Sequence, residues 1–284
     1  MAEPVLLREE TPWGVRLVLN RPEKLNAISA ELRDALLAAI ADAVADDRVR
    51  VVAIAGAGRA FCSGYDLSEV APETSWGWRD VLAKDVEATL AIWSCPKPVI
   101  AQVHGYALAG GLELAMACDL IVAADGTRLG EPEIRFGSAP VTLLMPFVIG
   151  QKKTRELLLT GDLIDAAEAE RIGLINRIVT ADALAGEVDA LADRLARVPP
   201  DVMAPTKLML NRAMDAAGFA AAVEMGLDIQ SFVNMSGTAR EFDVIVRRDG
   251  LTAALAWRDR RYDERLADAG RGRAGDAEGP PAEA

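Results

Sequence analysis

The chain has 284 residues, of which 51% are hydrophobic and 26% are charged, so its composition is that of a globular protein rather than a disordered chain. Its length fits one large domain, or one domain with a small appendage. With 43 acidic and 31 basic residues the net charge is −12, which argues against general binding to nucleic acid or to an anionic membrane surface.

Other features limit the location and the chemistry of the protein. No apolar run approaches the roughly 18 residues that cross a bilayer, and the N-terminal residues lack a basic start followed by an apolar stretch. We therefore expect a cytoplasmic protein. The cysteines Cys62, Cys95 and Cys118 form no close pair and are expected to be free thiols. The single histidine, His104, largely excludes a histidine-ligated metal, so we expect carboxylates, backbone amides or a cofactor to carry any chemistry.

Hydrophobic patterning predicts alternating strands and helices over the first part of the chain. The expected strands are residues 15–20, 49–55, 99–104 and 119–124. Ser29 is a suitable N-cap for a first helix. The apolar stripe of that helix recurs at steps of four residues, as Leu32, Leu36, Ile40 and Val44. Residues 69–80 lack clear periodicity and are expected to form a loop, and helices are expected at 81–93 and 112–118.

The pattern changes after residue 181. Before it, strand–helix alternation indicates an α/β architecture. After it, the strands stop and helices are expected at residues 182–197, 202–217, 219–235 and 237–248. We divide the chain into a sheet-containing core (1–198), a helical region (199–265) and a tail (266–284). The tail is rich in Gly, Ala, Pro and Asp and has few large apolar residues, so we expect it to be disordered.

The segment 105–114 combines a strand end, a glycine turn and a helix start. Gly110 and Gly111 let a ligand approach the backbone closely, and the helix that begins there directs unpaired N–H groups at it, which suits a developing oxyanion. Glu113 lies among apolar neighbours, and burial would raise its pKa towards a useful acid–base value. The alternative is that Glu113 only stabilises the helix dipole.

A second carboxylate, Glu133, follows Pro132 just after another short strand. Taken alone, it has the pattern of a surface turn residue. Two carboxylates that converge on one cleft could, however, divide the roles of acid and base between them.

Several motifs, taken together and in order, resemble the enoyl-CoA hydratase/isomerase family, also called the crotonase family. They are Asn20-Arg-Pro-Glu-Lys-Leu-Asn-Ala27, Ala60-Phe-Cys-Ser-Gly-Tyr-Asp-Leu67, Lys97-Pro-Val-Ile-Ala101, the segment from Gly105 to Asp119, Gly130-Glu-Pro-Glu-Ile134 and Leu159-Thr-Gly-Asp162. The resemblance covers roughly residues 12–262. It implies a crotonase-like ββα spiral core with two roughly perpendicular sheets, followed by a C-terminal helical trimerisation region, and a homotrimer or a dimer of trimers.

The resemblance also implies a substrate and a site. The substrate would be an acyl-CoA thioester, with coenzyme A as part of the substrate and no separate cofactor or metal. The backbone N–H groups of Tyr65 and Gly110 would form the oxyanion hole. Glu113 and Glu133 would hold a water molecule, Glu113 acting more as base and Glu133 more as acid. Coenzyme A contacts would fall on Lys24, Leu25, Ala27, Ser63, Asp66 and Leu67.

One departure from the family's pattern leaves the exact reaction open. After the second glutamate, hydratases of the family show a glycine-rich turn, whereas this chain has Ala139-Pro-Val-Thr-Leu-Leu-Met-Pro146. Val141 and Leu144 would narrow the acyl pocket, and Trp76 and Trp78 would shape it. Enoyl-CoA hydration is the favoured reaction. The alternatives are a double-bond isomerase, a C–C bond hydrolase, or an acyl-CoA binding protein without catalytic activity.

Overall fold

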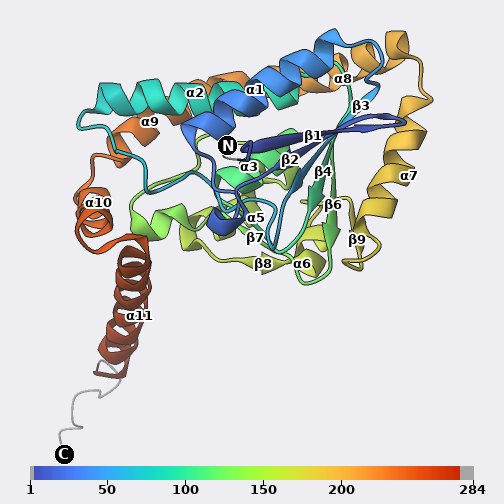
Figure 1. Cartoon of the computed structure of the whole chain (residues 1–284). Coiled ribbons are helices and arrows are strands. Elements are labelled where there is room, and N and C mark those ends of the chain that lie inside the picture. The colour runs from blue at the N-terminus through green and yellow to red at the C-terminus, as the bar shows by residue number, and fades with distance from the viewer. Residues whose placement is uncertain (1–2, 276–284) are drawn as a thin grey trace, which may run out of the picture.

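The computed structural model describes residues 3–275, and side chains up to residue 263. The larger of its two sheets has six strands in the order β1-β2-β3-β4-β6-β9 (Figure 1). β1 and β2 form an antiparallel hairpin, and every other pair in this sheet is parallel. The strands are β1 (Leu6–Thr11), β2 (Gly14–Leu19), β3 (Val51–Gly56), β4 (Val99–Val103), β6 (Leu120–Ala124) and β9 (Arg177–Val179).

Both faces of this sheet are covered, which is why its inner strands β2, β3, β4 and β6 are apolar at nearly every position. In β3, Val52 and Ile54 point into the main core with helices α1 (Ala30–Ala45), α2 (Ser75–Ser94) and α3 (Gly110–Ala117). Their neighbours Val51 and Ala53 face the opposite side, where they pack against α7 (Leu184–Ala196). The period of two along the strand therefore builds two separate apolar layers.

The second, smaller sheet positions the candidate site. It consists of β5 (Tyr106–Leu108), β7 (Arg128–Gly130) and β8 (Ile164–Asp165). Two isolated bridges extend it towards the N-terminus, because Cys62 pairs with Ala107 and Tyr65 pairs with Ile28. Successive turns of the chain are therefore stacked side by side, as in the spiral that the resemblance implies.

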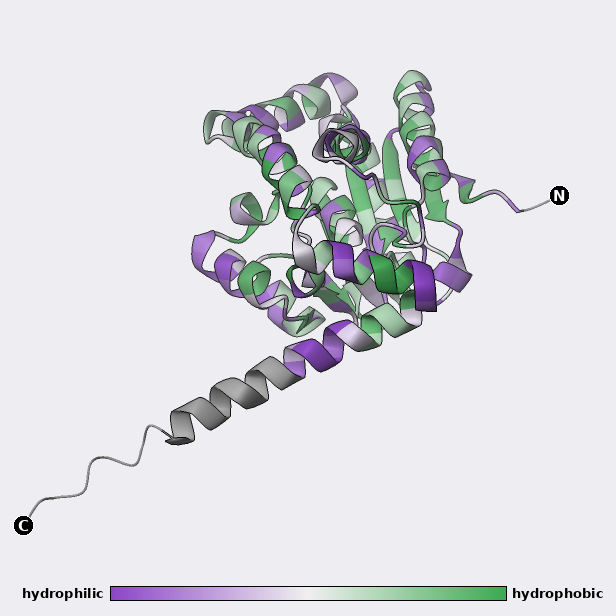
Figure 2. Ribbon diagram, turned by 90° about the vertical axis from the view of Figure 1, so that its left-hand side faces the viewer, coloured by the Kyte–Doolittle hydropathy of each residue, from purple (hydrophilic) through white to green (hydrophobic). Residues whose placement is uncertain are grey.

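Short helices lie in the connections between strands. They are η1 (Pro22–Lys24), η2 (Pro132–Phe136), α4 (Met145–Val148), α5 (Gln151–Thr160) and α6 (Ala166–Arg171). The C-terminal helices are α8 (Pro200–Ala216), α9 (Phe219–Val233), α10 (Gly237–Asp249) and α11 (Leu251–Gly275). α10 packs on η2 through Phe136 and Phe242, whose ring centroids lie 4.8 Å apart. Figure 2 shows α11 projecting away from the rest of the molecule.

Most of the predicted elements are present, and the differences have physical reasons. β1 was not among the predicted strands; it is mostly polar, and its alternation is weak. The loop predicted at 69–80 is wrong in its second half, because Thr74 caps α2 by accepting a hydrogen bond from the Gly77 N–H at 3.0 Å. In α1, Val44 is 37% exposed and Ala43 is buried instead.

The helical region begins at Pro200, close to the predicted boundary at residue 199. α11 continues to Gly275, inside the segment predicted as a disordered tail, and its alanine and arginine residues are good helix formers. Residues 276–284 lie outside the described part of the chain. The three cysteines are free and buried, as predicted. No helix in the described range has the length and apolarity needed to cross a bilayer.

Candidate active site

Two turns of the spiral meet at the centre of the candidate site. One contains Gly64 and Tyr65, and the other leads from β5 through Ala109 into α3. A Cβ atom on Gly64, whose φ is +99°, would lie 2.7 Å from the Ala109 Cβ and 3.4 Å from the Gly110 N. Only a glycine at residue 64 lets the two turns approach this closely.

The N–H groups of Tyr65 and Gly110 donate to no carbonyl oxygen among the described residues. Around Tyr65 the neighbouring amides are used, because the Asp66 N–H donates to the Ile28 oxygen at 2.9 Å. Gly110 is the first residue of α3, where N–H groups have no partner within the helix. The two turns thus present two free donors at a helix N-terminus, which is the arrangement of an oxyanion hole.

Gly110 and Gly111 are needed here because a side chain would not fit, and not because they adopt unusual backbone angles. The positive φ at this turn falls on Ala109 (φ 54°), a strained conformation for a residue other than glycine. A Cβ on Gly110 would lie 2.5 Å from the Tyr65 ring, and one on Gly111 would lie 2.5 Å from the Cys62 oxygen. The strained Ala109 and the close packing of Gly110 and Gly111 together fix the direction of the Gly110 N–H.

Glu113 lies one turn further along α3 and is fully buried. Its Oε1 accepts hydrogen bonds from the N–H groups of Val141 at 2.6 Å and Thr142 at 2.9 Å. Its Oε2 has no partner in the described chain. Burial raises the pKa of Glu113 to about 7, although the two N–H groups act in the opposite direction. The expected direction of the shift is therefore confirmed.

Two more glutamates flank Pro132 at the start of η2. Glu133 is 8% exposed, and its Oε2 has no hydrogen-bond partner among the described residues. Burial, and then the charge of Glu113, raises the pKa of Glu133 to about 8. Glu131 is 2% exposed and neither of its oxygens has a partner in that range. Burial and the charges of Glu133 and Glu113 raise the pKa of Glu131 well above its usual value.

Three buried carboxyl groups without a buried cation cannot all be ionised near neutral pH, so they share protons. The charge of Glu113 acts on both Glu131 and Glu133, so all three lie on the same side of the molecule. Within the part of the chain that the structure describes, no three His, Cys, Asp or Glu side chains are grouped to hold a metal ion. The arrangement can therefore take up and release protons beside two free backbone donors.

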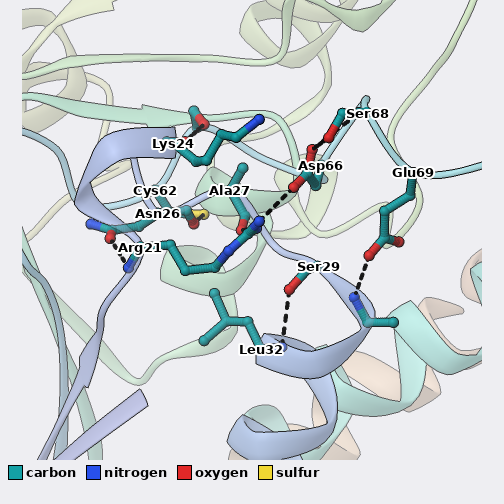
Figure 3. Close-up of polar contacts among 12 residues, drawn as sticks. Arg21, Lys24, Asn26, Ala27, Ser29, Leu32, Cys62, Asp66, Ser68 and Glu69 are labelled. Carbon is teal, nitrogen blue, oxygen red and sulfur yellow. Dashed lines mark hydrogen bonds and ion pairs between the residues drawn. The ribbon is translucent and has the colours of Figure 1, made fainter. Parts of the chain in front are cut away.

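The outer rim of the site is held by polar contacts between the two N-terminal motifs (Figure 3). Arg21 forms an ion pair with Asp66 at 2.7 Å and also donates to the Ala27 oxygen. Asn26, in the left-handed conformation with φ 56°, donates to the Ala60 oxygen at 2.8 Å and accepts from the Arg21 N–H. These contacts fix the loop that carries the predicted coenzyme A contacts.

The predicted coenzyme A residues gather on this rim with different exposures. Lys24 is exposed and Ser63 is half-buried, and the Ser63 N–H donates to the Leu25 oxygen at 3.0 Å. Asp66 is occupied by Arg21 and Ser68, which lower its pKa. The remaining three are Leu25 (half-buried), Ala27 (buried) and Leu67 (37% exposed).

The predicted acyl-pocket residues divide into two groups. Val141 and Leu144 are buried, and the Val141 N–H binds Glu113. Trp78 is half-buried and packs against the main core, whereas Trp76 is 76% exposed. The isolated chain offers Trp76 no pocket to line, because the helix that replaces the predicted loop turns it outward.

The structure adds groups that the sequence did not single out. Asp85 of α2 is buried and pairs with Arg33 of α1 at 3.2 Å, yet burial raises the pKa of Asp85 to about 6. Glu131 was noticed only as a neighbour of Glu133. The two carboxylates in Glu-Pro-Glu on a short strand end were the available signal, but nothing in the sequence indicated that both would be buried.

Comparisons with known proteins agree with this geometry. The family model described as "Enoyl-CoA hydratase/isomerase" matches residues 14–240. A crystal structure of an enoyl-CoA hydratase/isomerase from Xanthobacter autotrophicus Py2 is similar, with a TM-score of 0.88 and 40% identity over 90% of this chain and 98% of that one. A probable enoyl-CoA hydratase of Mycobacterium bovis is 36% identical over 76% of this chain and 84% of its own. A crotonyl-CoA hydratase of Syntrophomonas wolfei is 37% identical over 68% and 75%.

Proposed function

Because this chain belongs to the enoyl-CoA hydratase/isomerase family, we propose that it is an enzyme that adds water across the 2,3-double bond of an enoyl-CoA thioester. The observation that carries the proposal is the pairing of two free N–H groups with buried, incompletely bonded glutamates. Glu113 and Glu133 each keep one oxygen without a partner in the described chain.

The proposed reaction starts at the thioester carbonyl. Tyr65 N–H and Gly110 N–H bind its oxygen and stabilise the negative charge that develops there. Each such donor contributes about 2.7–4 kcal/mol to transition-state stabilisation in enzymes where one has been removed. The helix dipole of α3 acts in the same direction.

The two glutamates divide the proton transfers. Glu113 has the lower pKa, and two N–H groups hold its Oε1, so its Oε2 is the base that removes a proton from water. The water oxygen bonds to the β-carbon, and the electron pair of the double bond moves towards the thioester. Glu133 has the higher pKa and supplies the proton to the α-carbon. The product is a 3-hydroxyacyl-CoA, and a proton returns from Glu113 to Glu133 before the next turnover.

We place coenzyme A on the rim formed by Leu25, Ala27, Ser63 and Leu67. Lys24 is exposed beside them, and its ammonium group suits a phosphate. Asp66 acts through its ion pair with Arg21, which holds the two N-terminal motifs together.

We also propose that the chain assembles into a homotrimer or a dimer of trimers. Large apolar side chains on α8 and α9 are exposed in the single chain, as expected of an interface. They are Val202, Leu208, Met209, Leu210, Met225, Ile229 and Phe232. Light scattering after size exclusion tests this assembly, and a single-chain mass would contradict it. The cytoplasmic location expected from the sequence stays a prediction.

One observation favours a second candidate reaction of the same family. Val141 and Leu144 are buried where hydratases of the family have glycines, and this narrower wall suits a double-bond isomerase or a C–C bond hydrolase. An isomerase needs only one carboxylate to shuttle a proton.

The deciding experiment is a screen of enoyl-CoA thioesters with product mass analysis. We expect crotonyl-CoA, or a longer or branched analogue, to lose its conjugated thioester absorbance and gain the mass of one water. Loss of absorbance without a change of mass would indicate isomerisation. Tight binding without any product would indicate a non-catalytic acyl-CoA binding protein and would overturn the proposal.

A further inference from the structure

The proposed hydration uses the backbone of Tyr65 but leaves its side chain without a role. The ring lies over the α-carbon of Gly110, because a Cβ there would be 2.5 Å from Cε2 and 2.8 Å from Cζ of the ring. The hydroxyl oxygen is buried and has no hydrogen-bond partner among the described residues. Buried hydroxyl groups in proteins are nearly always paired, so an unpaired one beside a candidate site calls for a ligand.

The surroundings of the hydroxyl are polar and lie between α2 and α3. The Thr89 hydroxyl is beside it, and the carboxyl groups of Asp85 and Glu113 are close enough to act on it. The Thr89 hydroxyl donates to the Asp85 carbonyl oxygen at 3.2 Å, and the Asp85 carboxylate is paired with Arg33. The hydrogen of Thr89 is therefore used, and the Tyr65 hydroxyl lies close enough to Thr89 for that residue to act on its pKa but has no partner at hydrogen-bond geometry among the described residues.

We propose that the Tyr65 hydroxyl binds a neutral oxygen atom on the acyl chain, so that the protein prefers hydroxylated or keto acyl-CoA thioesters to plain hydrocarbon ones. This inference rests on the proposed function, which places the acyl chain beside Glu113. The Oε2 of Glu113 and the Tyr65 hydroxyl are both buried without a partner in the described chain, and the charge of Glu113 acts on that hydroxyl. An acyl chain whose α- and β-carbons lie at Glu113 therefore comes within reach of the tyrosine.

The charges around the tyrosine exclude an anionic acyl chain. Asp85 and Glu113 are the acidic groups that act on its hydroxyl, and the nearby Arg33 is already bound to Asp85 and Asp34. Burial, and then the charges of Glu113 and Asp85, raise the pKa of Tyr65 well above its usual value. The phenol therefore stays protonated and remains a hydrogen-bond donor rather than a base.

The position of the oxygen follows from the proposed chemistry. Carbon 1 is held by the two N–H groups, and carbons 2 and 3 face the glutamates, so carbon 4 is the first position left for recognition. Saturated thioesters cannot be hydrated, and they test this recognition separately from turnover. The probes are butyryl-CoA, 4-hydroxybutyryl-CoA and succinyl-CoA, with dissociation constants measured by calorimetry.

We expect the natural chain to bind 4-hydroxybutyryl-CoA about fivefold more tightly than butyryl-CoA, the gain of one hydrogen bond, and to bind succinyl-CoA most weakly. In Tyr65→Phe the ratio of the first two constants should fall to about one. The control Tyr106→Phe removes a hydroxyl from an exposed tyrosine of β5 and should keep the fivefold ratio.

Two results would overturn the inference. One is equal affinity of the natural chain for butyryl-CoA and 4-hydroxybutyryl-CoA, and the other is a preference that survives in Tyr65→Phe. Hydration of crotonyl-CoA by the natural chain distinguishes these failures from a failure of the proposed function, because hydration does not depend on an oxygen at carbon 4. If no thioester binds at all, both proposals are wrong.

Discussion

Carboxylates on the two sides of the candidate oxyanion hole behave in opposite ways. Asp66, next to Tyr65, is paired with Arg21 and accepts two hydrogen bonds from Ser68, and these contacts lower its pKa. Glu113, one turn after Gly110, is buried and forms no ion pair within the described part of the chain, and burial raises its pKa. One side of the site therefore uses a carboxylate to fix a loop, and the other keeps one available for proton transfer.

The difference shows what the fold must supply for acid–base chemistry. A paired carboxylate is stabilised in its charged form, so it holds structure but is a poor base at neutral pH. A buried carboxylate with few partners has a pKa nearer to neutrality and exchanges protons readily. The two kinds of carboxylate therefore give opposite pH dependences of the free energy of unfolding. The stabilisation by the Asp66 ion pair is lost as pH falls, whereas the buried glutamates lower the stability of the folded state as pH rises.

The largest expected effect comes from Glu113→Gln, on the side of the site that carries the buried glutamates. The amide keeps the shape of the side chain but cannot accept the proton of water, so we expect kcat for crotonyl-CoA or the preferred substrate to fall by about 10²- to 10⁴-fold. Steady-state kinetics measure it. The control Glu87→Gln changes an exposed glutamate of α2 and should leave kcat within about twofold. Retained activity in Glu113→Gln would remove Glu113 from the mechanism.

Glu133→Gln tests whether hydration requires both Glu113 and Glu133. For hydration we expect a loss of kcat of the same order, since the α-carbon would lose its proton donor. The natural enzyme should give a bell-shaped pH profile with limbs near the pKa values of about 7 and about 8, which belong to the coupled pair. The descending limb should disappear in Glu133→Gln. Full turnover by this variant would favour an isomerase.

The sequence predicted the burial of Glu113 better than it predicted the groups around Glu113. Glu113 was expected to be buried because its neighbours along the helix are apolar, and it is. The N–H groups that hold it come from Val141 and Thr142, on a different segment of the chain. No local pattern encodes such a contact, and the segment was expected only to line the acyl pocket.

Other features that the residues alone did not predict also arise from tertiary packing. The spiral and the second sheet could be expected only from the resemblance, because the sheet consists of strands too short to show periodicity. Trp76 was expected to shape the acyl pocket because the family varies its pocket in this segment. The Thr74 cap starts α2 early and leaves Trp76 exposed in the single chain, and its role in a pocket stays a prediction. The roles assigned to the coenzyme A residues stay predictions.

A smaller effect, on stability, is expected from Arg21→Met, which removes the cation of the ion pair with Asp66. The side chains of Arg21 and Asp66 are 16% and 6% exposed, so the change leaves a mostly buried carboxylate without its cation. We expect the free energy of unfolding to fall by about 2 kcal/mol at neutral pH, measured by urea denaturation. Arg48→Met, in the exposed pair with Asp46, should cause no measurable change. Equal effects of the two variants would contradict the comparison.

A change in the slope of stability against pH, rather than in stability at neutral pH, is expected from Glu131→Gln. Burial and two neighbouring carboxylates raise the pKa of Glu131 in the folded protein. At low pH this group is protonated in both states. As pH rises above about 4.5, the unfolded chain releases the proton while the folded chain keeps it, so unfolding becomes more favourable. Glutamine has no such proton. Above about pH 5, and until the folded chain also releases this proton, the stability of the natural chain should therefore fall more steeply than that of the variant, by up to about 1.4 kcal/mol per pH unit. Urea denaturation at several pH values measures both slopes, and Glu156→Gln, an exposed glutamate of α5, should keep the natural slope. Parallel curves for Glu131→Gln and the natural chain would mean that Glu131 is ionised in the folded state, and the contrast with Asp66 would then not extend to it.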